Sequence, residues 1–522
     1  MQTLLQSRLQ AIDSAKLQQT LTGMRRGIEK ESLRIDPNGH LAQTPHPKAL
    51  GSALTHESIT TDYSEALLEF ITPAFEAIDQ PLEYLDKLHR FTYQQLENEK
   101  LWVNSMPCIM DGELSIPIAE YGSSNIGKMK TIYRHGLWHR YGRLMQTIAG
   151  IHYNVSFPEN FWQGLQRIDG NDAPLQDYIS DQYFRLIRNF QRYVGLVIYL
   201  YGASPAVCPT FLRGRQHNLE WLNEKQNTLY TPYGTSLRMS DLGYHNDAQA
   251  GLKVSYNSLQ EYIQNLSHAM RTPHQAYVDL GVKKDDQYQQ LNANILQIEN
   301  EYYGSIRPKR TIQRGERPTT ALAKRGVEYI EMRCVDLDPY LPIGIGKRQM
   351  RFLETFALFC LLEDSPEISD QELECINFNR EAIVLNGRNP ELKLHCGSNE
   401  VGFHEWASSV VGKIQTVAKL LDEAHGTDLY TKAVESQQEK ISSPEKTRSA
   451  KIIQQIRNED TSFYQFAMQQ AKQHEAYFLE KPLDAADLEM LKTAANQSLA
   501  DQTQIEESDD KTFEQFLSDY FR

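Results

Sequence analysis

The sequence lacks several features that would assign it to a class at once. Its 522 residues include only six cysteines, at positions 108, 208, 334, 360, 375 and 396, and no two of them form a CxxC pair. Thiols so sparse and so widely spaced exclude a disulfide scaffold and a ribbon-type zinc site. The longest apolar run, LVIYLYGA from Leu196, is far too short to span a bilayer.

The chain also lacks a recognisable signal peptide and a basic stripe. Its first residues, MQTLLQSRLQAIDSAK, contain no continuous apolar segment and predict an amphipathic helix. The formal net charge is −14 at pH 7, which disfavours a nucleic-acid-binding surface. We therefore expect a cytoplasmic protein with reduced thiols that binds neither nucleic acid nor a membrane.

The amino-acid composition, 40% hydrophobic and 23% charged, is typical of a globular protein. The length suits either three average domains or one large domain with appended helices. From about residue 348 onward helical patterns dominate, so the carboxyl-terminal part is expected to be mainly helical.

An acidic pair stands out in the stretch GIEKESLRI, which begins at Gly27. In a strand, Glu29 and Glu31 lie on one face, roughly 6.6 Å apart. Their repulsion is about 0.6 kcal/mol in water and about 2.5 kcal/mol at an effective dielectric constant of 20. On a wet surface the pair is harmless, whereas in a cleft it favours a cation such as Mg²⁺.

Three further strand-like segments carry polar side chains on one face. They are ALLEFITP with Glu69, GIHYNVSFP with His152 and Asn154, and VEYIEMRCVD with Glu331 and Arg333. An antiparallel sheet with one packed face alternates in this way, so solvent exposure explains each segment taken alone. The choice of acids, an imidazole and an arginine instead favours a face that lines a cleft and holds a divalent metal.

Basic residues that could neutralise phosphate occur elsewhere in the chain. Arg238 lies in a tyrosine- and glycine-rich loop region, and a cluster of Arg307, Lys309 and Arg310 follows a strand expected within residues 292–310. A solvated charge run is the alternative for this cluster. The stretch GSSNIGKM from Gly122 resembles a phosphate-binding P-loop, but Met129 occupies the position of the Mg²⁺-binding hydroxyl, which disfavours that function.

Long strings in this sequence resemble one family. RRGIEKESLRI, ALGSALTHESITTDYSEALLEFITP, GIHYNVSFP, TSLRMSDLGY, LQIENEYYGSIRPKR and GVEYIEMRCVD closely resemble the proteobacterial type of glutamate–cysteine ligase, in order, from about residue 20 to 360. The resemblance implies ATP- and Mg²⁺-dependent ligation of L-glutamate to L-cysteine through γ-glutamyl phosphate, the first step of glutathione synthesis. Mn²⁺ is an alternative metal.

The resemblance also implies a fold. It is of the α+β class, with a glutamine-synthetase-like antiparallel sheet curled into a funnel, helices outside it and a helical carboxyl-terminal part. We expect a single ligase domain over residues 1–522, made of an amino-terminal helix (1–22), a catalytic sheet region (23–350) and a mainly helical part (351–522). A monomer is expected, with the small molecules glutamate, cysteine and ATP as its partners.

Carried over position by position, the resemblance implies three sets of site residues. The Mg²⁺ ligands would be Glu29, Glu31, Asp62, Glu69, His152 and Glu331. The catalytic residues would be Arg238, Arg333 and Glu331, with Arg307, Lys309 and Arg310 beside the nucleotide phosphates. The substrate-binding residues, most of them in a cysteine pocket, would be Tyr63, Tyr133, Arg134, Leu137, Gln146, Asn154, Tyr244 and Tyr303.

Two departures from the family limit what can be carried over. Some relatives have phenylalanine where this chain has Tyr63, whose hydroxyl adds a polar group to the edge of the pocket. Some also have a cysteine after the FWQ segment that can pair with the one at Cys108; here FWQGLQR has none, so that redox switch is not expected. A ligase that uses another amine, and a non-catalytic paralogue that binds metabolites, remain the alternatives.

Overall fold

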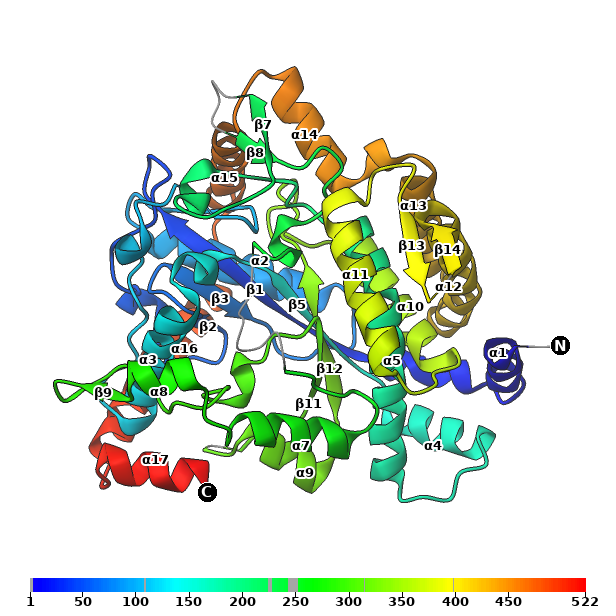
Figure 1. The fold of residues 1–522 in the computed structure, drawn as a ribbon, viewed down its shortest axis with the longest axis horizontal. Helices are drawn as coiled ribbons and strands as arrows, with labels where there is room; N and C mark the ends of the chain where they lie inside the picture. The colour runs from blue at the N-terminus through cyan, green and yellow to red at the C-terminus, as the bar shows by residue number, and fades with distance from the viewer. Residues whose placement is uncertain (1–2, 108, 224–227, 243–251, 314, 398) are drawn as a thin grey trace.

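The structure is a computed structural model that describes residues 3–107, 109–223, 228–242, 252–313, 315–397 and 399–522. Within these residues a seven-stranded sheet crosses the middle of the molecule and helices pack around it (Figure 1). Every pairing in this sheet is antiparallel, so the predicted α+β class is confirmed. Its strands are β1 (Arg25–Ile35), β2 (Ile59–Thr61), β3 (Leu67–Ile71), β4 (Lys100–Leu101), β5 (Ile151–Ser156), β11 (Ile306–Lys309) and β12 (Tyr329–Val335).

The sheet is organised around β1, an 11-residue strand. The strand order is β11-β12-β5-β1-β3-β2, and β4 pairs with the end of β1. Among the described residues three short sheets lie outside it: β6 (Ala206–Val207) with β7 (Glu220–Asn223) and β8 (Thr228–Tyr230), β9 (Lys283–Lys284) with β10 (Gln287–Tyr288), and β13 (Lys393–Cys396) with β14 (Asn399–Gly402).

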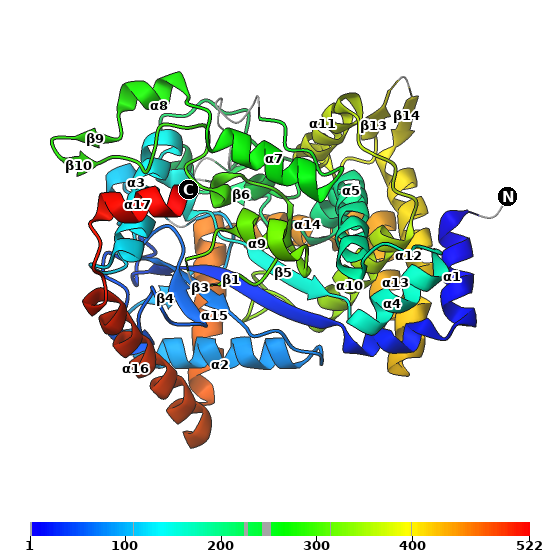
Figure 2. The ribbon, with the colours of Figure 1, turned by 90° about the horizontal axis from the view of Figure 1, so that it is seen from below.

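Helices cover both faces of the large sheet, as Figure 2 shows with α2 below it and α3, α7 and α17 above it. The helices are α1 (Leu4–Ser14), α2 (Gln80–Gln95), α3 (Asn125–Tyr141), α4 (Glu159–Ile168), α5 (Leu175–Tyr201), α7 (Leu259–Ala269), α8 (Gln275–Leu280), α9 (Pro318–Arg325), α10 (Lys347–Leu362), α11 (Asp370–Asn386), α12 (Phe403–His425), α13 (Leu429–Ser442), α14 (Arg448–Asn458), α15 (Phe463–Glu480), α16 (Ala485–Glu507) and α17 (Phe513–Phe521). None of the helices in the described part of the chain has a stretch apolar and long enough to cross a membrane.

The two faces of the sheet differ in chemistry because successive side chains of a strand alternate. On one face Ile28, Tyr153, Val155, Ile330 and Met332 are buried in the main hydrophobic core. The residues between them in sequence point to the other face, which is polar. The alternation that the sequence predicted for these strands is therefore observed.

The apolar face also contains a buried ion pair. Arg26 Nε lies 2.6 Å from Glu354 Oε1, and both side chains are at most 1% exposed. The hydroxyls of Tyr153 and Tyr430 donate to Glu354 at 2.7 and 3.0 Å. This network ties β1 and β5 to α10 and α13.

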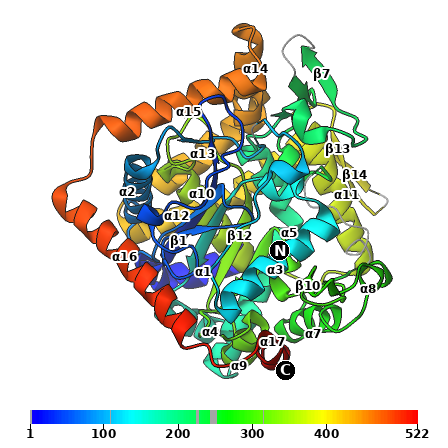
Figure 3. The same cartoon turned by 90° about the vertical axis from the view of Figure 1, so that its left-hand side faces the viewer.

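The carboxyl-terminal helices return to the amino-terminal half of the chain, and α16 runs along one side of the molecule to α17 (Figure 3). Ser123 N donates to Glu506 Oε1 at 2.8 Å, and Asn125 Nδ2 donates to the carbonyl of Lys511 at 2.9 Å. Leu517 shares a buried apolar cluster with Met129 of α3. Helices α16 and α17 therefore brace α3 from outside.

Some local predictions need correction. The amino-terminal helix ends at Ser14 and a 3-10 turn follows, because Lys16 adopts a left-handed conformation with φ of 52°. The strand expected within residues 292–310 is confined to β11. By contrast, the interpretation that disfavoured a P-loop at Gly122 agrees with the structure: the stretch is the start of α3, where Ser124 Oγ accepts from Gly127 N at 3.2 Å, and no strand precedes it in residues 109–123.

Candidate active site

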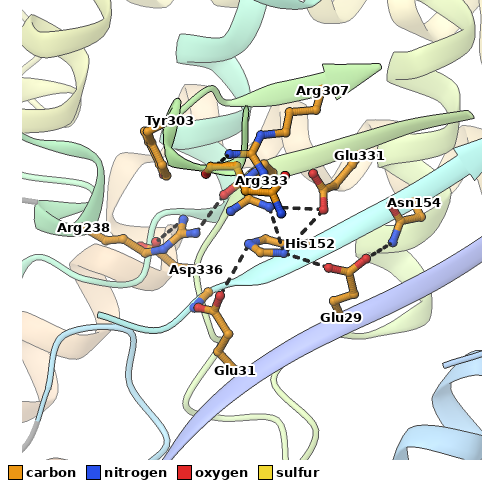
Figure 4. Close-up of polar contacts among 12 residues, drawn as sticks. Glu29, Glu31, His152, Asn154, Arg238, Tyr303, Arg307, Glu331, Arg333 and Asp336 are labelled. Atoms are coloured by element: carbon orange, nitrogen blue, oxygen red, sulfur yellow. Dashed lines mark hydrogen bonds and ion pairs between the residues drawn. The ribbon is translucent and has the colours of Figure 1, made fainter. Parts of the chain in front are cut away.

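The polar face of the sheet gathers side chains from β1, β3, β5 and β12. In the register of the strands Glu29 lies opposite His152, and Glu31 lies opposite Glu69. Glu331 lies opposite Asn154. Residues that lie opposite each other share a face, so segments more than 300 residues apart meet at one place (Figure 4).

His152 stands at the centre of this acidic face. Its Nδ1 lies 3.1 Å from Glu29 Oε2 and 3.8 Å from Glu331 Oε1, and its Nε2 lies 3.6 Å from Glu31 Oε1. Glu29, His152 and Glu331 each offer one ligand atom, and these atoms lie within 4.8 Å of one another. Asn154 Nδ2 donates to Glu29 Oε1 at 2.9 Å and holds that carboxylate in place.

The protonation of these carboxylates differs from one to the next. Burial, with Glu29 and Asp62 beside it, raises the pKa of Glu69 well above its ordinary value, and burial also raises that of Glu31. Burial opposes ionisation of Glu331 as well, but Lys309 and Arg333 outweigh it and hold the pKa of Glu331 well below its ordinary value. The cluster therefore contains more carboxylate than its own cations neutralise.

The donor set fits a hard divalent cation such as Mg²⁺. Carboxylate oxygens and one imidazole are available, and the buried Glu331 Oε2 has no hydrogen-bond partner among the described residues. Burial and the repulsion from Glu29 and Asp62 raise the pKa of Glu69, and a divalent charge would offset that repulsion. Asp62 acts on Glu31 and Glu69 electrostatically and so stands beside the same cluster.

Positively charged side chains lie on the side of the cluster that faces β11 and β12. Arg333 Nη1 lies 3.1 Å and Lys309 Nζ 3.3 Å from Glu331 Oε1. Arg307 donates to the carbonyls of Asn300 and Tyr302. The sequence grouped Arg310 with Lys309, but β11 ends at Lys309 and the next side chain points elsewhere, with contacts to Gln176 and Glu328.

Arg238 approaches the cluster from a short 3-10 turn, Leu237–Met239. Its Nη2 donates to the carbonyl of Arg333 at 2.8 Å, and its Nη1 lies 3.7 Å from Asp336 Oδ1. Figure 4 shows Tyr303 beside Arg238 and Arg333. The buried Asp336 is fixed in turn by Ala203 N, Ser204 Oγ and Ser236 Oγ at 2.8, 2.7 and 3.0 Å.

Gly150 supports both Arg238 and Glu31. Its amide donates to Glu31 Oε2 at 2.7 Å, and its carbonyl accepts from Glu31 N at 3.1 Å. A Cβ at this position would lie 2.5 Å from Arg238 Cζ and 2.7 Å from Nε. The guanidinium therefore rests flat against the backbone of residue 150.

The expected cysteine-pocket residues lie toward α3 and the turn between β2 and β3. Tyr133, Arg134 and Leu137 belong to α3, and Arg134 Nε donates to the carbonyl of Asp62. The buried Tyr63 Oη and Gln146 Nε2 have no hydrogen-bond partner among the described residues. Two buried donors without acceptors indicate a place for a polar ligand. Two of the named residues, Tyr244 and Cys108, lie outside the described residues.

Comparison with known proteins identifies the family. A profile described as glutamate-cysteine ligase matches residues 9–383, well over half of the chain. The chain belongs to the glutamate–cysteine ligase family. It is 53% identical to the glutamate–cysteine ligase of Alcanivorax borkumensis over 99% of both chains, and 50% identical to that of Pseudomonas entomophila over 95% of this chain and 93% of the other.

Solved structures agree with this membership. The glutamate–cysteine ligase of Francisella tularensis, crystallised in complex with AMP, superposes with a TM-score of 0.90 at 36% identity, covering 96% of this chain and 97% of that one. A bifunctional glutathione synthetase from Pasteurella multocida has the same fold, with a TM-score of 0.73 at 24% identity over 93% of this chain and 58% of that one.

Sequence reasoning missed two residues of this ligase-family site. Asp336 directly follows the strand with Glu331 and Arg333, and its acidic side chain next to those residues was an available signal. Gly150 directly precedes the strand with His152, but a glycine gives no sign that its missing side chain makes room for an arginine. Both residues help to position Arg238, which lies in a segment far from them in sequence.

Proposed function

We propose that this enzyme joins the γ-carboxylate of L-glutamate to the amine of L-cysteine, consuming ATP and releasing γ-glutamylcysteine, ADP and phosphate. In a cell this would be the first step of glutathione synthesis. The observation that carries the proposal is the group of Glu29, His152 and Glu331 beside Arg333, in a chain 53% identical to a curated glutamate–cysteine ligase. The AMP-bound Francisella ligase supports ATP as the nucleotide.

The arrangement suits activation of a carboxylate. A carboxylate is a poor acyl donor, and phosphorylation by ATP converts it into γ-glutamyl phosphate, which the amine then attacks. The site has to neutralise the negative charge of the phosphate and that of the tetrahedral intermediate. Arg238 and Arg333 would stabilise both negative charges. Lys309, with Arg307 behind it, would face the nucleotide phosphates.

Mg²⁺ fits the acidic cluster, with Mn²⁺ as an alternative. Bound metal would supply charge neutralisation for phosphate oxygens and for the carboxylates themselves. The residues that would hold it are Glu29, Glu31, Asp62, Glu69, His152 and Glu331. Asn154 orients Glu29 through its amide, and Lys309 and Arg333 keep Glu331 ionised.

The acceptor amine would bind between α3 and the polar face of the sheet. Tyr63 Oη and Gln146 Nε2 would donate hydrogen bonds to polar groups of the acceptor molecule other than the attacking nitrogen. The pocket would be lined by Tyr133, Arg134, Leu137 and Tyr303. The hydroxyl of Tyr63 gives this chain a donor at a position where relatives can have phenylalanine.

The remaining expectations belong to the same proposal. They are a sheet curled into a glutamine-synthetase-like funnel, one ligase domain over residues 1–522 with the three regions 1–22, 23–350 and 351–522, a monomer, and a cytoplasmic location. One continuous buried core, from Leu5 of α1 to Ala495 of α16, supports the single domain.

The test is ADP release with Mg²⁺-ATP and L-glutamate, with L-cysteine, 2-aminobutyrate or other amines added separately. We expect release that strongly prefers cysteine, and γ-glutamylcysteine as the product. Glutamate-dependent release with another preferred amine would keep the chemistry and overturn the substrate. ATP binding without turnover on any amine would favour a non-catalytic paralogue.

A further inference from the structure

Helix α17 packs on a small apolar cluster that is separate from the main hydrophobic core. The buried members of this cluster are Leu517 of α17, Met129 of α3 and Leu291. Tyr133, which is expected in the acceptor pocket, packs against the same cluster from α3. Figure 2 shows α17 alongside α3 on the upper side of the molecule. Helix α17 is therefore in contact with a wall of the proposed acceptor pocket.

The same helix also holds the segment of residues 283–303, which ends at Tyr303. Glu514 Oε1 accepts from Tyr288 Oη at 3.2 Å, and the rings of Phe513 and Tyr288 meet edge-on with their centroids 5.1 Å apart. Leu291, in the middle of this segment, is buried in the cluster. Helix α17 therefore joins the two segments that are expected to supply aromatic side chains to the acceptor pocket.

The two segments are also tied together without α17, but at the other end of α3. Arg140 Nη1 lies 2.9 Å from Glu301 Oε1, with both side chains fully buried, and Tyr141 Oη donates to the same oxygen at 2.8 Å. No hydrogen bond or ion pair among the described residues joins residues 125–132 to residues 283–296. The amino-terminal half of α3 therefore depends on the apolar contacts of α17 for its position against that segment.

Helix α17 can leave its place at a low cost in free energy. Of its nine described residues only Leu517 is buried, and residues 508–512 before it are exposed. Isolated helices shorter than about 12–15 residues are marginal in water, so α17 depends on its docking site for its own structure. Few buried apolar contacts and an exposed linker are typical of a segment that opens locally.

We propose that α17 is a clamp that closes the acceptor pocket, with Leu517 as its positioning residue. The docked helix holds the amino-terminal half of α3 against residues 283–303 and so fixes Tyr133 and Tyr303 relative to each other. The undocked helix leaves the expected metal ligands in place, because they lie outside this cluster. The assignment rests on the proposed ligase function, with its acceptor pocket on α3.

The first experiment releases the clamp in the full-length enzyme. Leu517→Asp puts a charge into the apolar cluster and disfavours docking. If α17 is docked in about 1–10% of the variant molecules, the KM for L-cysteine rises about 10- to 100-fold, because apparent affinity falls with the binding-competent fraction. The kcat at saturating cysteine and the KM values for ATP and L-glutamate should stay within about twofold of wild type in steady-state ADP release. Leu517→Met keeps the apolar volume and should restore the KM for cysteine.

Ser518→Asp is the matched control, because it adds the same charge at the next residue of α17, whose side chain is exposed. It should leave the KM for cysteine within about twofold of wild type. Equal rises in the KM values for cysteine, ATP and glutamate, or a fall in kcat, would show a general structural effect and overturn the proposal. Leu517→Ala, a milder change, should give a smaller but equally selective rise and replaces the aspartate variant if that one does not fold.

Hydrogen exchange tests the docking directly. Coupling between binding events is reciprocal, so an acceptor that binds better to the docked form has to favour docking. In the wild type, saturating L-cysteine with L-glutamate and Mg²⁺-ADP should slow exchange of the α17 amides and leave those of α1 unchanged. No slowing, or an unchanged KM for cysteine in a Leu517→Asp enzyme whose α17 amides exchange freely, would overturn the clamp. A wild-type enzyme that ligates no amine would instead overturn the ligase function, so wild-type ADP release with cysteine separates the two failures.

Discussion

Replacing Gly150 by alanine tests whether the position of Arg238 limits the reaction. The added Cβ would lie 2.5 Å from Arg238 Cζ, and non-bonded carbon atoms prefer about 3.5 Å, so the guanidinium has to move by about 1 Å. That movement disturbs the 2.8 Å bond from Arg238 Nη2 to the carbonyl of Arg333. A misplacement of about 1 Å in a catalytic group can cost about 100-fold in rate.

We therefore expect Gly150→Ala to lower kcat by about 100-fold while the protein stays folded. The clash costs about 1–3 kcal/mol of stability at most, because the obstructing atoms are the end of a side chain. The amide of residue 150 can still donate to Glu31, so the KM for glutamate should change little. Steady-state ADP release gives kcat and KM, and thermal unfolding gives the stability.

Two further variants complete this test. Gly412→Ala is the control, because a Cβ there has no atom within 4 Å, and it should retain wild-type turnover. Asp336→Asn removes the charge 3.7 Å from Arg238 Nη1 and should also lower kcat. Wild-type turnover in Gly150→Ala would refute the reasoning, since it would mean that Arg238 tolerates displacement.

Three other predictions follow from the site and the core. Glu331→Gln should lower kcat by at least about 100-fold with an unchanged circular dichroism spectrum, because Glu331 is a proposed metal ligand; near-normal ADP release would remove it from the site. Glu354→Gln should cost about 3–5 kcal/mol in urea unfolding, because it leaves Arg26 buried without a counter-ion. The double variant Arg26→Met/Glu354→Gln should recover most of that loss, because the amide oxygen can still accept from the hydroxyls of Tyr153 and Tyr430. Burial and Arg448 lower the pKa of Lys440 to about 7, so between about pH 7 and 10.4 the unfolded chain binds more protons at this residue than the folded one. Its contribution to stability therefore rises with pH in that window by up to about 1.4 kcal/mol per pH unit, and Lys440→Met should remove that rise in denaturation curves recorded at several pH values.

The acidic face could be predicted because side chains alternate with a two-residue period in β1, in β5 and in β12 up to Met332, after which the pairing of β12 with β5 shifts register. In such strands the side chains that share a face are determined by local sequence alone. Glu29, His152 and Glu331 were found in this way. Their order across the sheet was not predictable, since strand pairing depends on contacts between segments far apart in sequence.

The residues that sequence reasoning missed act through tertiary contacts. Asp336 is an ordinary acidic residue in the sequence, and only its place 3.7 Å from Arg238 Nη1 gives it significance. Arg310 was assigned to the site because it follows Lys309, but one residue changes the direction of a side chain at the end of a strand. Local pattern thus predicted the face, and packing determined which cations reach it.

The brace formed by α16 and α17 has a consequence for the order of folding. Its hydrogen bonds to residues 123 and 125 join positions 383 and 386 residues apart. Closing so long a loop costs little at equilibrium, about 0.6 kcal/mol for each doubling of length, but contacts of this separation form slowly. Helix α3 with Tyr133 and Arg134 should therefore become rigid after the sheet has formed. During refolding, we expect discrimination between acceptor amines to return later than nucleotide binding.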